Sequence, residues 1–221
     1  MPGRFFTSFD EAWSFFLDRE EPLEDFFAQF PEDDSYLLGW LIRFDESLVA
    51  AVREVQDAFS HLDWIVRPPE RFLHTWLAGV VLAPRSPSKD EIANAAERAA
   101  RAWASEPSFD VTYRGINCFH TGVVVEVVGD GPRSLVERLN DSGQQGIRIE
   151  TFLPHLTIGA LRGANDPAPL REVLVPLHDF GLGAQTVTEA TLCVVPASQA
   201  TILRSWDFVG SVALSQAQRL R

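Results

Sequence analysis

Phe152-Leu153-Pro154-His155-Leu156-Thr157-Ile158 is an apolar run that carries one imidazole and one hydroxyl, two residues apart. Side chains alternate between the two faces of a β-strand, so the run predicts that His155 and Thr157 share one face while Leu156 and Ile158 share the other. A proton donor or acceptor then lies beside a hydrogen-bond donor on a rigid element. A lone histidine in such a run is more often a hydrogen-bonded core residue than a catalytic one, so this stretch by itself does not define a site.

An earlier run of the same build, Phe72-Leu73-His74-Thr75-Trp76-Leu77-Ala78, carries a second histidine. By the same alternation, His74 shares a face with Trp76, whereas Thr75 points to the opposite face. Two apolar strands that each present a histidine together with the side chain two positions later predict the two halves of one site.

Paired His-x-Thr/Ser strands of this kind resemble the two-histidine phosphoesterase superfamily, which includes 2′,3′-cyclic phosphodiesterases and the so-called 2′-5′ RNA ligases. The double proline Pro68-Pro69 before the first histidine is similar to the family pattern, as is the valine-rich run at 123–127, followed by a helix, before the second. The sequence departs from that pattern at Trp76, which stands where the family has Thr or Ser. Thr75 cannot replace that hydroxyl on a regular strand, because its side chain faces away.

The resemblance implies an α+β fold with two similar lobes related by a pseudo-twofold axis, in which two antiparallel sheets line a central cleft and the helices lie outside. It covers roughly residues 35–215, so we expect the two-lobed domain to occupy residues 35–221. The order of the predicted elements agrees with this, because strand, helix, strand, helix occurs once before Ser105 and once after it, with one histidine strand in each half.

The resemblance also implies a chemistry: a metal-independent phosphoesterase, without a cofactor, that acts on a cyclic phosphodiester of a nucleotide or of a short RNA end. Imidazoles titrate near neutral pH, so His74 and His155 could serve as the acid and the base. Thr157 would donate to a phosphate oxygen as that oxygen gains charge. Trp76 removes one such donor but offers an indole that could stack on a base.

Two other classes of function stay open at this level. The scaffold could be a module that binds a nucleotide or a phosphorylated metabolite, with its catalysis weakened by the change at Trp76. It could also be an interaction protein anchored by its acidic N-terminus. We favour the enzyme, because both histidines are present and the sequence contains no dinucleotide-binding, phosphate-loop, zinc-protease or serine-hydrolase motif.

The charge distribution argues against binding of long nucleic acids. The chain has a net charge of −12, and residues 1–34 contribute −8 of it through ten acids and two arginines. Only one lysine, Lys89, occurs, and no basic run has aromatic residues interleaved. Affinity for a polynucleotide depends on many Lys and Arg contacts, so we expect a small nucleotide or a short RNA end as the partner.

Residues 1–34 are predicted to form an acidic helical extension outside the family pattern. Phe9, Trp13, Phe16 and Leu17 recur with helical spacing after Ser8, a plausible N-cap, and Pro22 is placed to open a second short helix. We interpret the extension as an appendage packed on the domain, with a dimerisation arm or a lid as the alternatives.

No run of the sequence approaches the roughly 18 to 20 apolar residues of a membrane span, and the N-terminus lacks the features of a signal peptide, so cytoplasmic residence is expected. Cys118 and Cys193 lie in apolar runs without metal-ligand spacing and are predicted to be buried thiols. His61 and His178 receive no role. His120 follows the end of the strand at Phe119 and could border the cleft, but a histidine at a turn is more often a solvated residue. A phosphate contact for Arg162 is doubtful, because the family arginine stands closer to the histidine.

Further elements follow from local patterns. Ser88 and Glu91 form a capping box for a helix that reaches Ser105. Strands are predicted over 35–44, 109–119, 123–128 and 186–195, with further strand segments over 200–208 and 209–214. A short helix is predicted to begin at Pro167.

Overall fold

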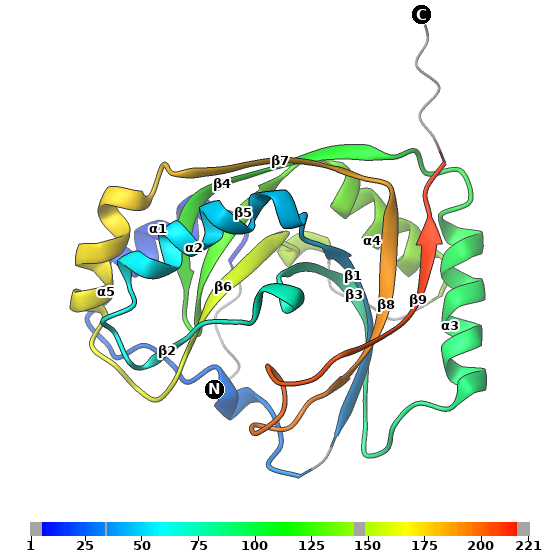
Figure 1. Ribbon diagram of the computed structural model, residues 1–221, viewed down its shortest axis with the longest axis horizontal. Coiled ribbons are helices and arrows are strands. Elements are labelled where there is room, and N and C mark those ends of the chain that lie inside the picture. Colours follow the sequence, from blue (N-terminus) through cyan, green and yellow to red (C-terminus); the bar gives the residue numbers. More distant parts are fainter. Residues whose placement is uncertain (1–5, 34, 144–148, 216–221) are drawn as a thin grey trace, which may run out of the picture.

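The computed structural model describes residues 6–33, 35–143 and 149–215 and has an α+β architecture (Figure 1). The helices are α1 Phe9–Asp18, α2 Val49–Ala58, α3 Lys89–Ala102, α4 Gly131–Asp141 and α5 Pro167–Leu174. The strands are β1 Tyr36–Arg43, β2 Ile65–Val66, β3 His74–Ala83, β4 Phe109–Phe119, β5 Gly122–Val128, β6 His155–Leu161, β7 Gly181–Val187, β8 Glu189–Pro196 and β9 Asp207–Ala213. Short 3-10 turns are η1 Phe27–Gln29, η2 Glu46–Leu48, η3 Glu70–Phe72, η4 Ile149–Thr151 and η5 Val175–Leu177.

The strands form a curled antiparallel sheet in the order β7-β4-β5-β6-β3-β1-β8-β9, with β2 paired to β6 (Figure 1). Most neighbouring strands pair over several residues, but β3 and β6 share one registered pair, Thr75 with Leu156. The sheet therefore consists of two lobes that meet at this pair. We call β3-β1-β8-β9 the first lobe and β7-β4-β5-β6 with β2 the second. The predicted α+β fold with two antiparallel sheets is confirmed, and the structure adds that the sheets join where the two histidine strands meet.

The two faces of the curled sheet bury different clusters. Alternation along β1 sends Leu38, Trp40 and Ile42 into the main core, whereas Leu37 and Leu41 belong to a smaller cluster on the other face. Trp103, at the end of α3, closes the main core: its ring meets Trp40 edge-on at 5.0 Å, and its indole N–H donates to the Leu135 carbonyl of α4 at 2.9 Å. The helices α3 and α4 thus cover one face, and the other face is free to form the inside of a cleft.

Local signals predicted several elements correctly. The Ser8 hydroxyl accepts from the Glu11 amide at the start of α1, and the capping box of Ser88 and Glu91 opens α3. The helix at Pro167 is α5. Cys118 and Cys193 are both buried free thiols. No helix of the described residues is long and apolar enough to cross a membrane.

Three predictions were wrong, the first two because long-range pairing overrode local pattern. No helix begins at Pro22, because the amides of Leu23 and Phe26 donate to the carbonyls of Asn165 and Leu161 instead of to a helical turn. The predicted strand over 186–195 is two strands, since β7 pairs with β4 in the second lobe and β8 pairs with β1 in the first. Most of the predicted strand over 200–208 is a turn, and β9 begins only at Asp207.

Candidate active site

Each histidine is the first residue of its strand and is held in the same way. The Nδ1 atom of His74 lies 2.6 Å from the Phe72 carbonyl oxygen, and the Nδ1 atom of His155 lies 2.7 Å from the Leu153 carbonyl oxygen. A carbonyl can only accept, so both rings carry their proton on Nδ1 and leave Nε2 as the free ring nitrogen. Two strands in different lobes thus orient an imidazole by the same contact to the backbone two residues earlier.

The single registered pair of β3 and β6 shows which face of the sheet carries the four predicted site residues. Thr75 pairs with Leu156, and side chains alternate along a strand, so His74 and Trp76 of β3 and His155 and Thr157 of β6 all point to the face opposite that of this pair. The site residues of both strands therefore share one face of the sheet, and the two imidazoles lie close enough for a charge on His155 to lower the pKa of His74.

A cavity of about 340 Å³ opens on this face of the sheet, and His74, Trp76 and Thr157 line it. His155 is not among its lining residues; its ring instead packs edge-on against Phe119 with the centroids 4.9 Å apart. The other lining residues are mainly apolar or aromatic: Phe26, Gln29, Phe30, Leu37, Pro68, Phe72, Val195, Ile202, Leu203 and Trp206. No Lys or Arg occurs among these described lining residues.

Trp76 is part of the cavity wall, and Gly39 makes room for it. A Cβ atom at Gly39 would lie 2.2 Å from Cζ2 of the Trp76 indole, far inside van der Waals contact. The glycine on β1 therefore allows the indole to lie close against the strand. Trp206, from the segment before β9, meets His74 at 4.4 Å and Trp76 at 6.3 Å between ring centroids, both edge-on.

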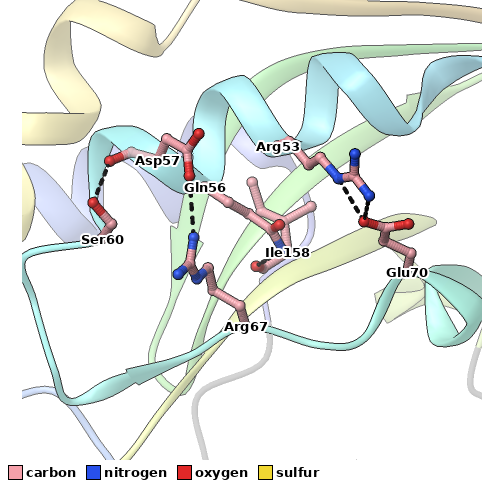
Figure 2. Close-up of polar contacts among 7 residues, drawn as sticks. All are labelled: Arg53, Gln56, Asp57, Ser60, Arg67, Glu70 and Ile158. Atoms are coloured by element: carbon pink, nitrogen blue, oxygen red, sulfur yellow. Dashed lines mark hydrogen bonds and ion pairs between the residues drawn. The ribbon is translucent and has the colours of Figure 1, made fainter.

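Helix α2 contacts the chain next to both histidines (Figure 2). Its Arg53 pairs with Glu70 of η3, and its Asp57 lies 3.1 Å from Arg67, so the segment leading to His74 is tied to the helix by two ion pairs. The buried Gln56 side chain donates to the Ile158 carbonyl of β6 at 2.9 Å. One helix thus contacts both the segment before the first histidine and the strand of the second.

Burial in these apolar surroundings controls the charge of both imidazoles. It lowers the pKa of His74 to about 4; the hydrogen bond to Phe72 opposes this, and the neighbouring His155 adds to it, because two like charges would repel. Burial also lowers the pKa of His155, although the hydrogen bond to the Leu153 carbonyl acts to raise it. Both rings are therefore neutral at pH 7 in the free protein.

We expect the His74 ring to titrate with a midpoint near 4 when its proton resonances are followed by NMR, and the His155 ring to titrate below 6.5. His74 has a pKa near 6.5 in the unfolded chain and about 4 in the folded protein, so between these pH values the unfolded chain binds a proton that the folded protein does not. His74 should therefore make the free energy of unfolding decrease as pH falls from 6.5 toward 4. Urea unfolding at several pH values should show a weaker decrease for His74→Asn. A midpoint near 6.5 for His74 would contradict this account of the site.

The remaining candidates lie outside the cavity. His178 stacks on Trp13 of α1 with centroids 3.9 Å apart, and His120 stacks on Phe6 at 4.8 Å, so both hold the N-terminal segment. The Arg162 guanidinium lies over the Phe27 ring at 4.8 Å. Among the described residues, no group of three or more His, Cys, Asp or Glu is placed to hold a metal ion.

Sequence reasoning missed Trp206, Gly39 and Phe119. Trp206 reaches His74 from a turn with no periodic pattern. Gly39 is a single small residue within an apolar strand, and its meaning appears only when Trp76 is beside it. Phe119 ends a strand that was predicted, and its contact with His155 depends on how β4 and β5 are placed next to β6.

No protein-family model matches the sequence, and no curated protein matches it. Solved structures do match. TT0787 of Thermus thermophilus superposes with a TM-score of 0.63 at 15% identity, over 82% of this chain and 100% of that one. LigT of E. coli in its apo form superposes with a TM-score of 0.58 at 20% identity, over 83% of this chain and 100% of that one. A structure described as a phosphoesterase superposes with a TM-score of 0.56 at 20% identity, over 81% of this chain and 98% of that one. This chain therefore has the fold of LigT and of that phosphoesterase, the fold implied by its resemblance to the two-histidine superfamily.

Proposed function

We propose that this protein is a phosphoesterase that opens a cyclic phosphodiester of a nucleotide, using His74 and His155 as the acid–base pair. The observation that carries the proposal is the pair itself: two imidazoles on abutting strands of different lobes, each with Nδ1 bonded to a backbone carbonyl and Nε2 free. E. coli LigT has been solved in complexes with 3′-AMP and with phosphate, which supports a small nucleotide as the ligand.

In this proposal, the Nε2 atom of one neutral histidine takes a proton from water, and the water oxygen attacks phosphorus. The bond from phosphorus to one ribose oxygen breaks, and the other histidine, protonated on Nε2, gives its proton to that oxygen. The bound phosphate supplies the negative charge that raises the pKa of the second histidine from its low value in the free protein. Each proton transfer accelerates the reaction by a factor of about 10²–10⁴.

Thr157 is the side-chain hydroxyl that would donate to a non-bridging phosphate oxygen, because it lines the cavity together with His74. Trp76 stands where the family has a second hydroxyl, and an absent donor of this kind weakens transition-state stabilisation by about 2.7–4 kcal/mol. We therefore expect a slow enzyme for its class.

The purified protein should convert 2′,3′-cyclic mononucleotides to a single phosphomonoester regioisomer, because the acid can face only one of the two ribose oxygens. Chromatography of the four cyclic nucleotides, each incubated with an excess of EDTA, checks both points. The rate should be the same with and without the chelator, since the proton transfers and the hydroxyl donor come from side chains. Activity that is abolished by EDTA and restored by a divalent ion would contradict the mechanism.

A catalytically weakened nucleotide-binding module is the second candidate. It is favoured by the missing hydroxyl at Trp76 and by the apolar lining of the cavity, which lacks Lys and Arg among its described residues. Calorimetry would separate the two: saturable binding of a cyclic nucleotide with no product after prolonged incubation would support the module and reject the enzyme.

A further inference from the structure

Residues 23–33 cross from the second lobe to the first beside the cavity, and we call this segment the strap. On the second lobe, the Leu23 amide donates to the Asn165 carbonyl at 2.8 Å and the Phe26 amide donates to the Leu161 carbonyl at 2.9 Å. On the first lobe, the Gln199 amide donates to the Pro31 carbonyl at 3.0 Å. In Figure 1 the strap runs below the sheet from the left-hand strands toward β1. The strap is thus hydrogen-bonded to both lobes.

The inner side of the strap is a wall of the catalytic cavity. Phe26 and Phe30 line the cavity, as do Ile202 and Trp206 of the segment between β8 and β9. Apolar and aromatic side chains therefore surround the space next to His74 and Thr157. Aromatic surfaces of this kind stack on nucleobases of any sequence, and the volume of about 340 Å³ is at the low end for small-molecule sites.

The outer side of the strap is acidic. Glu24, Glu32 and Asp33 are exposed on it. Arg19 lies 3.5 Å from Glu24 and is itself buried, whereas no ion pair involving Glu32 or Asp33 occurs among the described residues. A strand of RNA that extended past the strap would bring its additional phosphates toward these carboxylates. The negative charges would then repel each other.

We propose that the strap is a selectivity element: it admits a nucleoside that carries a single cyclic phosphate and disfavours the end of a longer strand. The proposal rests on the phosphoesterase function and specifies its substrate class. The apolar inner side accepts one base and its sugar, and the acidic outer side disfavours every further phosphate.

The test compares kcat/KM for adenosine 2′,3′-cyclic phosphate with kcat/KM for a hexanucleotide that ends in the same cyclic phosphate. At low salt the mononucleotide should be preferred by about tenfold or more, within the range of electrostatic effects on association. Raising the ionic strength from 0.01 to 0.15 M shortens the Debye length from about 30 to about 8 Å, so the preference should shrink. The double variant Glu32→Gln/Asp33→Asn should shrink it at low salt without changing turnover of the mononucleotide.

Glu137→Gln/Asp141→Asn is the matched control, because these exposed acids lie on α4, which packs against the main core on the other face of the sheet. This control should leave the preference as it is. Equal kcat/KM for both substrates in the wild type, or a preference that responds to neither salt nor the strap variant, would overturn the proposal. Turnover of neither substrate would instead refute the phosphoesterase function.

Discussion

His74→Ala and His155→Ala should each lower kcat for a 2′,3′-cyclic mononucleotide by about 10²–10⁴, the usual contribution of one general acid or base. The two imidazoles act on the same phosphate, so their effects are not independent. The fold-decrease in kcat of the double variant should therefore be much smaller than the product of the fold-decreases of the two single variants. Steady-state kinetics with one cyclic nucleotide, measured from pH 4 to 9, provide all the values. The wild-type profile should be bell-shaped, and the double variant should lose both limbs.

His61→Ala is the control for these variants, because His61 is exposed on the turn after α2 and does not line the cavity. It should keep wild-type turnover. Circular dichroism and urea unfolding would show whether the two site variants keep the fold. A folded His155→Ala protein with undiminished kcat would refute the two-histidine mechanism, and the packing of His155 against Phe119 would then be its whole role.

The strands that carry the histidines could be predicted because their signal is local. Alternation along each run was enough to place Trp76 with His74 and Thr157 with His155, and the helix caps at Ser8 and Ser88 involve neighbours within one turn. The register between β3 and β6 is not local, because it depends on one pair of residues contributed by separate lobes. The sequence could therefore suggest that the site has two halves, but not how they face each other.

The cavity walls were harder to predict for the same reason. Pro22 is a plausible start of a helix by its local neighbours, yet the chain there forms backbone bonds to the end of β6. Trp206 and the strap aromatics come from segments without periodicity, and they meet only because the two lobes curl toward each other. Residues that complete a site from irregular segments leave no pattern in the sequence.

Trp76→Thr should raise turnover, by up to about 10²–10³, because it restores a hydroxyl donor in the cavity wall beside His74. The same change removes an indole from the cavity wall, so affinity for the nucleotide should fall by an amount comparable to one stacking contact, about 1–3 kcal/mol. The two effects separate in kinetics: kcat rises while the dissociation constant measured by calorimetry increases. If the protein is a binding module, the variant should show activity where the wild type shows none.

Trp76→Phe and Gly39→Ala distinguish the hydroxyl from the shape of the wall. Trp76→Phe keeps an aromatic surface without adding a donor, so it should not raise kcat. Gly39→Ala leaves every polar group in place but puts a methyl group where the indole lies, at 2.2 Å from Cζ2. The indole must move, so Gly39→Ala should weaken nucleotide binding without the gain in kcat expected of Trp76→Thr. If Trp76→Thr alters only the urea midpoint, with kcat and affinity unchanged, then Trp76 supports the wall and has no part in recognition or catalysis.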